Sequence, residues 1–547
     1  MRHPRFLPAT RAVSGLVLAA LVISLAFLQV NEARADTTGT LTITSNTNLN
    51  EDHQGNIVIA ADGVTLDCQG HEVTGTGSGT GVLLNGRTGV TVKNCHVSGF
   101  LQGFGLFNAS SGNTLTGNTT NKNTGDGFFL SPASTSNTLT NNSATNNGRF
   151  GFFLFAATGN SLTGNTSNNN LVDGFAVFGA SSGNTLTGNT ADKNSRHGFS
   201  LLDSDNNVLI GNSANQNGVQ GFAFNASSNN AVTGNTANLN SSVGFHLFLA
   251  SEFNTLTENI ANNNVDQGFS LSSSNNTLTG NTANNNGDVG FRLDSSSNNT
   301  LTNNIATNNA TNGLILVSAT ANTLTGNTAN VNGNSGFALS NASGNTLTGN
   351  TANVNGSSGF GLFNASSGNT LTGNTANKNT GDGFFLSPAS TNNTLTNNSG
   401  TNNGRFGFFL FTATGNSLTG NTSNNNLVDG FAVFGASSGN TLTGNTADNN
   451  SRHGFSLLDS DNNVLLGNSA KKNGVNGFAF NGSSSNTVTG NTADFNGAVG
   501  FQLFSASEFN TLTLNTACNN AVLDALDNST GAGNVYVDNV FCTSSGI

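Results

Sequence analysis

The sequence predicts an all-β protein, a single-stranded parallel β-helix of roughly twenty coils with about 23 residues per coil. A Gly-Phe-x-Leu segment returns every 22 to 24 residues, as at Gly198-Phe199 and Gly221-Phe222. An Asn-x-Leu-x-x-Asn segment returns with the same period in about eighteen copies. Residues that favour helices are scarce, whereas Asn, Gly, Ser and Thr dominate. Period-2 segments separated by small-residue turns fit three short strands per coil, and their regular Phe and Leu residues argue against a disordered chain.

The amino-acid composition excludes some classes of binding partner. A repeat array of 547 residues can be one long domain. A net charge of -11 and a pI near 4.9 argue against nucleic acid and anionic membrane surfaces as partners. The chain has 40 Phe but one Tyr and no Trp, which weighs against the amphipathic aromatic platforms that sugar-binding surfaces use.

Residues 1–35 have the pattern of a secretory signal peptide. Arginines precede an apolar stretch over Val13–Val30, and Ala33-Arg34-Ala35 offers a cleavage site that leaves a mature chain from about Asp36. The alternative is an uncleaved anchor helix, because the apolar stretch is nearly long enough to span a bilayer. We expect cleavage, a secreted or periplasmic location, and no membrane insertion afterwards.

The mature chain divides into three predicted parts. Residues 36–102 form an N-terminal cap and the first coils, residues 103–515 form the regular repeats, and residues 516–547 form a C-terminal cap. The segment 521–526 has a helical pattern, and Tyr536 and Phe541 are expected to close the last apolar layer.

Each repeated residue of a coil is expected to point either into the β-helix or towards solvent. Phe175, Phe199 and Phe222 should stack above one another inside the helix, as should Leu186, Leu209 and Val232. An inward Asn after the second strand can donate to and accept from the neighbouring coils. We place four representatives of this position inside: Asn118, Asn189, Asn350 and Asn445.

A longer repeat lies over the short one. Residues 103–256 return almost unchanged at 359–512, an offset of 256 positions. The copy preserves surface letters as well as core letters. The similarity of the two copies is explained either by a functional site that is useful in two copies or by a recent duplication. The duplication is the simpler explanation.

Four cysteines form two pairs near the ends of the mature chain. Cys68 lies about one coil before Cys95, and Cys518 and Cys542 bracket the last coil. In an exported chain we expect two disulfides. The alternative is a Cys/His metal site that also uses His71 and His96, although the spacing is not that of a zinc finger. Thioether ligation of copper is excluded because Met1 is the sole Met. We expect no metal and no cofactor.

Charged residues just before successive Gly-Phe segments are the candidate catalytic residues. Because these residues alternate in sign, a structural charge ladder is one interpretation. The other is a groove in which Arg holds an acidic sugar and His or Asp acts as acid and base. Carboxylates on alternate coils would be about 9–10 Å apart, at or beyond the wide end of the inverting-glycosidase range. The candidates are Asp126, Arg149, Asp173, Arg196 and His197, repeated as Asp382, Arg405, Asp429, Arg452 and His453.

Thr-x-Thr pairs such as Thr346/Thr348 point outward and should stack into a hydroxyl array. Some β-helical ice-binding proteins present such an array, so ice binding is a minor alternative. Val208/Ile210 and Val464/Leu466 interrupt it.

The Gly-Phe-x-Leu and Asn-Thr-Leu-Thr-Gly-Asn segments, with Leu66-Asp67-Cys68-Gln69-Gly70-His71, give the chain a resemblance to right-handed parallel β-helix proteins. These are pectate-lyase-like proteins whose short repeats occur in carbohydrate-binding and sugar-hydrolase domains and in the periplasmic NosD family. The resemblance covers essentially the whole mature chain and implies the fold, because its motifs are ladder residues. Members that cleave pectin or alginate cluster Asp, Arg and Lys on one sheet. No such cluster is present here, so no catalytic residue is carried over.

We therefore predict an exported, non-catalytic, monomeric β-helix. It presents an extended polar surface to polysaccharide or a cell surface, or serves as a structural rod. The alternatives are a polysaccharide lyase or hydrolase, and a NosD-like accessory protein in copper handling.

Overall fold

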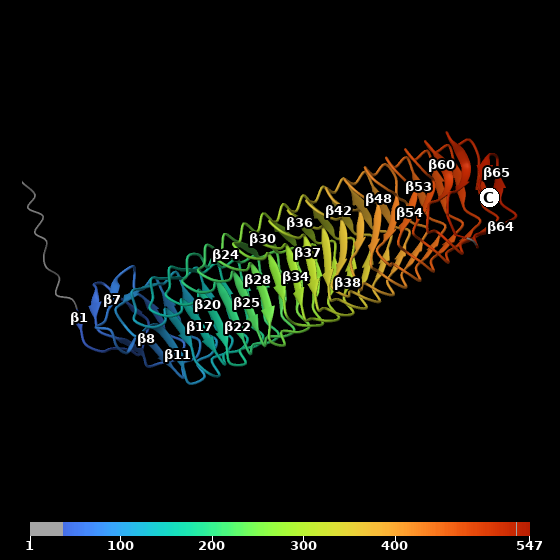
Figure 1. The fold of residues 1–547 in the computed structure, drawn as a ribbon. Helices are drawn as coiled ribbons and strands as arrows, with labels where there is room; N and C mark the ends of the chain where they lie inside the picture. The colour runs from blue at the N-terminus through green and yellow to red at the C-terminus, as the bar shows by residue number, and fades with distance from the viewer. Residues whose placement is uncertain (1–36, 532) are drawn as a thin grey trace, which may run out of the picture. The chain divides into compact units, whose positions relative to one another are not determined.

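The computed structural model describes residues 37–531 and 533–547, and the predicted signal segment lies outside this part (Figure 1). Thr37–Ile547 forms one compact unit. It is an all-β parallel solenoid of about 22 turns, roughly 23 residues per turn, without a helix among the described residues. The predicted fold class is confirmed. A search of the described residues for a helix able to cross a membrane finds none.

Most turns contribute one strand to each of three stacks of parallel strands, and at Thr190 and Thr422 the third strand is reduced to an isolated bridge. In one turn these strands are β17 (Phe152–Phe155), β18 (Ser161–Thr163) and β19 (Thr166–Asn168), and the next turn begins with β20 (Phe175–Phe178). Strand β17 pairs with β20 in parallel, with Phe152 beside Phe175. We name the sheets after their commonest residue: the Phe sheet contains β17, the Thr sheet β18 and the Ala sheet β19.

The Phe sheet carries the features described below. Its strands in the two long copies begin with Phe, except β11 and β60. Their bounds are β11 (Gln102–Phe107), β14 (Phe128–Leu130), β17, β20, β22 (Phe199–Leu202), β25 (Phe222–Asn225), β28 (Phe245–Phe248), and then β43 (Phe360–Phe363), β46 (Phe384–Leu386), β49 (Phe408–Phe411), β51 (Phe431–Phe434), β54 (Phe455–Leu458), β57 (Phe478–Asn481) and β60 (Val499–Leu503).

The predicted apolar ladders are confirmed. The rings of Phe175 and Phe199 stack with centroids 4.7 Å apart and 3° between their planes. The ladder runs from Phe104 to Phe291, is interrupted at Leu314, and resumes at Phe337. Each stacked pair adds about 0.5–1.5 kcal/mol beyond the burial of apolar area. A matching Leu186–Leu209–Val232 ladder lies under the Thr sheet.

Asparagine amides satisfy the turns between these sheets. The Nδ2 of Asn189 donates to the Leu162 carbonyl at 2.9 Å and to the Asn212 Oδ1 at 3.0 Å. Its Oδ1 accepts from the Asn165 backbone N–H at 2.9 Å. Asn118, Asn350 and Asn445 are equally buried. A column through Asn194, which the sequence analysis did not single out, makes the same contacts before the Phe sheet. The amides of Asn189 and Asn194 therefore each link a coil to the coils on both sides of it.

The Gly that precedes each inward Phe is required by close packing. A Cβ on Gly198 would lie 2.6 Å from the Ala214 Cβ and 2.8 Å from the Gly221 carbonyl oxygen. Both distances are shorter than van der Waals contact, so only Gly lets the chain pass from the Ala sheet into the Phe sheet here.

The C-terminal end differs from expectation in one respect. The segment predicted to be helical is strand β63 (Leu523–Asp527), which pairs with β60. The exposed edge of the preceding coil offers the backbone hydrogen-bond partners, and this tertiary pairing overrides local helix propensity. Tyr536 and Phe541 pack partly buried against the core, as predicted.

A disulfide lies near each end of the solenoid. Cys68 and Cys95 are joined with their Cα atoms 4.7 Å apart, and Cys518 and Cys542 with theirs 5.2 Å apart. The cysteines are therefore engaged as cross-links between neighbouring coils.

Candidate binding face

The predicted line of charged residues occupies two adjacent columns at the edge of the Phe sheet. The register Phe175↔Phe199 puts Asp173 beside His197. The Arg196 backbone N–H donates to Val172, so the arginines stand one position earlier, in the neighbouring column. The expectation of a single line is wrong by one residue, although every Arg reaches the Asp of the preceding coil.

The aspartates are buried and the arginines half-exposed. The Asp173 carboxylate accepts from the Arg196 Nε at 3.0 Å and Nη2 at 3.2 Å. Burial raises the pKa of Asp173 to about 6 against the opposing charge of Arg196, whose side chain is 47% exposed. Asp429 and Arg452 repeat this pair more tightly, with Nε at 2.7 Å. The other two Arg–Asp pairs of these columns are looser: Arg149–Asp126 at 3.6 Å and Arg405–Asp382 at 3.7 Å.

The Asp and His side chains satisfy backbone donors of the next coil. Asp173 accepts from the His197 N–H at 3.0 Å, and the His197 Nδ1 accepts from the Gln220 N–H at 3.3 Å. Asn312 and Asn476 do the same further along this column. Burial, with the adjacent Arg196 charge, lowers the pKa of His197 to about 3, so the ring is neutral at pH 7. This geometry describes a structural ladder of acceptors that leaves the guanidinium groups facing outward.

A cluster of phenylalanines lies on the outer face of the Phe sheet. Phe153 packs against Phe150 with centroids 4.8 Å apart and against Phe178 at 5.6 Å. The Arg149 guanidinium lies 4.9 Å from the Phe150 ring centroid. Phe155, at the edge of the cluster, is 42% exposed. Arg149 thus joins the charged columns to an aromatic surface.

The second long copy carries the same cluster. Arg405 lies over Phe406 at 5.1 Å, and Phe409 packs against Phe406 and Phe434. Phe411 is 41% exposed. We call the two clusters aromatic patch 1 and aromatic patch 2. Patch 1 consists of Phe107, Phe129, Phe150, Phe153, Phe155 and Phe178, and patch 2 of Phe363, Phe385, Phe406, Phe409, Phe411 and Phe434.

The sequence analysis missed these patches because it treated Phe as a core residue and sought Trp or Tyr on the surface. The signal is present in the Gly151-Phe152-Phe153-Leu154-Phe155 segment. With a period of two, inward Phe152 and Leu154 leave Phe153 and Phe155 outward.

A recess of about 170 Å³ lies beside aromatic patch 2. Phe434 and Phe504 contribute to its lining, and Ser456 and Ala479 occupy the outward positions of the Phe sheet there. Each lining residue has an identical residue 256 positions earlier. The lining is Phe434, Arg452, His453, Ser456, Leu457, Leu458, Ala479, Asn481 and Phe504. We call this set the Arg–His recess, and the corresponding residues of the first copy run from Phe178 to Phe248.

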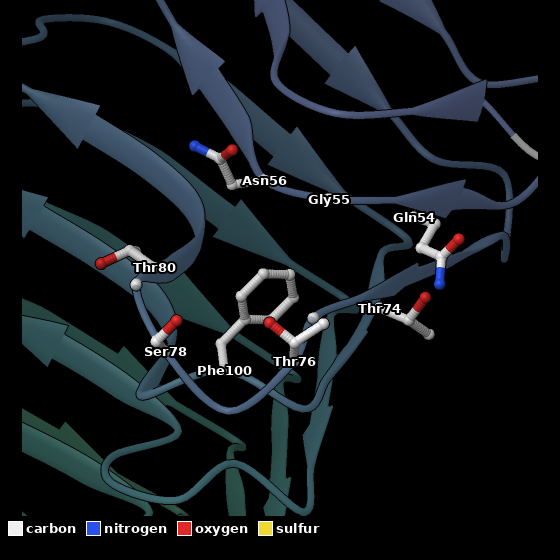
Figure 2. Close-up of a pocket in the computed structure, with 10 residues that line it drawn as sticks. Gln54, Gly55, Asn56, Thr74, Thr76, Ser78, Thr80 and Phe100 are labelled. Carbon is white, nitrogen blue, oxygen red and sulfur yellow. The ribbon is translucent and has the colours of Figure 1, made fainter.

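A larger recess of about 440 Å³ lies near the N-terminal end, where Figure 2 shows Phe100 amid Asn56, Thr76, Ser78 and Thr80. It arises where the coils change size. The register Leu41↔Ile57 spans 16 residues, whereas the register Ile57↔Val82 spans 25. The larger coil leaves a step that is lined by uncharged groups and is separate from the two copies.

The other candidate surfaces have fewer groups that could bind a ligand. Thr-x-Thr pairs are stacked in register on the Thr sheet, as Thr323↔Thr346 and Thr325↔Thr348, and the exposed Ile210 and Leu466 interrupt the array. His71 contacts Asp52 at 3.2 Å. Within residues 37–531 and 533–547, no group of three or more His, Cys, Asp or Glu side chains is arranged to hold a metal ion.

The fold and its repeated outer face define the class, a right-handed parallel β-helix repeat protein, pectate-lyase-like in architecture. The chain belongs to the family described as the right-handed beta helix region, whose model matches residues 33–191, 176–329 and 317–423. A second model, described as periplasmic copper-binding protein (NosD), matches residues 375–540. No curated protein has significant sequence similarity to the chain.

Similar solved structures include the mannuronan C-5 epimerase AlgE6 A-module of Azotobacter vinelandii, 15% identical over 79% of this chain and 91% of that one, with a TM-score of 0.29. The catalytic domain of a GH87 alpha-1,3-glucanase, solved with nigerose, is 18% identical over 48% of this chain and 62% of its own length, with a TM-score of 0.38. Pectate lyase Pel9A is 17% identical over 45% and 71%, with a TM-score of 0.27. Such identities carry nothing about a shared activity.

Proposed function

We propose that the protein is an exported, non-catalytic glycan-binding β-helix that holds uncharged polysaccharide against the outer face of its Phe sheet. The observation that carries the proposal is the aromatic patch beside the Arg–His recess. Phenyl faces pack against the apolar faces of sugar rings, and nearby guanidinium donors and Asn or Ser groups pair with hydroxyls. Export is supported by the signal-peptide pattern and by the periplasmic description of the NosD model.

The charge arrangement favours an uncharged ligand. Each Arg beside the patches and the recess is paired with a buried Asp, so the site offers donors with little net charge. The whole chain carries -11, which repels acidic polymers. A non-catalytic role is supported by the acceptor atoms of Asp173 and His197, which are engaged by backbone donors.

Binding to panels of uncharged and acidic polysaccharides, at low and high salt, tests the proposal. Phe155→Ala with Phe411→Ala removes the exposed edge of both patches without opening the core. Exposed aromatic contacts of this kind contribute on the order of 1 kcal/mol each, so we expect the affinity of each site for an uncharged glycan to fall about fivefold. Salt should have little effect.

The matched control is Ile210→Ala with Leu466→Ala. These residues are 42% and 43% exposed, close to the values for Phe155 and Phe411, but lie on the Thr sheet. The control should bind normally. Salt-sensitive binding to acidic polymers alone, or new reducing ends or unsaturated products during incubation, would instead support a lyase or hydrolase.

A further inference from the structure

The geometry points to bivalent binding, in which one extended glycan lies along the Phe sheet and occupies both long copies at once. This inference rests on the proposed function and adds the form of its ligand, a polymer with a repeating structure. It begins with the chemical equality of the two sites. The patches contain the same six Phe positions, and the Arg–His recess has the same residues in both copies.

The two sites face the same way along one sheet. Eleven successive parallel pairings connect Phe152 of β17 to Phe408 of β49 without a break. Figure 1 follows this sheet along the stack through β20, β28, β37 and β54. Coils in a parallel sheet are about 4.8 Å apart, so equivalent atoms of the two sites are about 53 Å apart along the axis.

Two identical sites that have the same orientation on one sheet suit a ligand that is a polymer. A glycan chain presents the same ring faces and hydroxyls at regular intervals and in one direction, so a segment bound at patch 1 leads onward to an equivalent segment at patch 2. The outer face between the copies also has a recess of about 260 Å³, lined in part by Ile315, Ala338 and Phe363. Phe363 itself belongs to patch 2, so this recess leads the chain into the second site.

The physical consequence is an effective concentration. Once one site is occupied, the second segment of the same polymer is held near its site, and the combined affinity exceeds that of a single site by about 10²–10⁴-fold when the connecting length matches the span. A ligand shorter than about 53 Å cannot gain this advantage, because it reaches only one site at a time. Two polymers held by one protein molecule are the competing arrangement.

The experiment compares a short oligosaccharide with a long polymer of the same uncharged glycan, by calorimetry and by sedimentation of the complexes. The proteins are wild type, Phe155→Ala, Phe411→Ala, both together, and the Ile210→Ala/Leu466→Ala control. The oligosaccharide should bind wild type at two sites of similar affinity. Each single variant should weaken one of these sites and leave the other unchanged.

For the long polymer, wild type should bind at least about 100-fold more tightly than it binds the oligosaccharide. Each single variant should lose most of that gain, nearly as much as the double variant. If the single variants keep the gain, or if wild type precipitates the polymer as a cross-linked network, one chain does not bridge the sites and the inference fails while the proposed function stands. If wild type binds neither ligand, the proposed function fails as well.

Discussion

The pair Asp173 and His197 allows a quantitative test of the buried column. Burial raises the Asp173 pKa from 3.8 to about 6 and lowers the His197 pKa from 6.5 to about 3. A carboxyl with a raised pKa stabilises the fold below pH 3.8, and this contribution is lost as pH rises to about 6. An imidazole with a lowered pKa acts oppositely, because its contribution is lost as pH falls below 6.5. Between about pH 4 and 6 the two effects cancel.

Asp173→Asn removes one side of this balance. A shift of about 2.2 pKa units at about 1.4 kcal/mol per unit corresponds to about 3 kcal/mol. The stability of wild type relative to the variant should therefore fall by about 3 kcal/mol between pH 4 and pH 6. Other titrating groups are common to both proteins and drop out of the difference. Urea unfolding followed by circular dichroism at several pH values provides the measurement.

The sign of the pH dependence decides the matter. If Asp173 were held ionised by Arg196, its pKa would lie below 3.8 and the difference between wild type and variant would be flat from pH 4 to 6. Such a flat difference would refute the claim that desolvation of Asp173 outweighs its ion pair. His197→Gln is the complementary variant. It leaves the Asp173 contribution unopposed, so the free energy of unfolding should decrease as pH rises from 4 to 6.

Three further outcomes follow from the packing. Phe199→Ala should cost about 3–5 kcal/mol, measured by urea unfolding, whereas Phe199→Leu should cost less than half as much, because the ladder already accommodates Leu314. Gly198→Ala should cost about 1–3 kcal/mol in the same assay, since its Cβ would lie 2.6 Å from that of Ala214. Cys518→Ser with Cys542→Ser should lower the stability of the last coil by about 3 kcal/mol, seen as faster amide exchange in β64 (Val535–Val537) and β65 (Val540–Phe541) with little change at β22.

The fold could be predicted from sequence because each ladder residue meets its own kind one coil away. Phe199 stacks between Phe175 and Phe222, and Asn189 donates a hydrogen bond to Asn212. Residues that are one repeat apart in the sequence are therefore in contact in neighbouring coils. The segment 521–526 could not be predicted in this way. It lies beyond the regular repeat, and local propensity alone did not reveal that the edge of β60 was available for pairing.

The candidate site could be predicted only in part. The order of charges indicated ion pairs between coils, and they form, but the depth of Asp173 was not visible in the pattern. The column two residues before each inward Phe lies at a corner where the next coil has an N–H without a sheet partner. Asn312 and Asn476 stand in this column and accept that N–H. Their presence among Asp and His was the sequence signal that the column is buried and structural.

The duplication itself separates scaffold from surface. Most substitutions between the two copies fall in turns and on the Ala sheet, as Asn215/Lys471 and Gln216/Lys472, where a side chain meets solvent and imposes little on its neighbours. The aromatic patches and the Arg–His recess are unchanged, although outward Phe residues are not needed for any ladder. His246/Gln502 is an exception on the face itself, next to Phe248 and Phe504. A binding surface that tolerates this exchange at its border fits a ligand recognised mainly through aromatic packing and uncharged donors. Burial lowers the pKa of His246, and a neutral imidazole and an amide can both donate and accept hydrogen bonds.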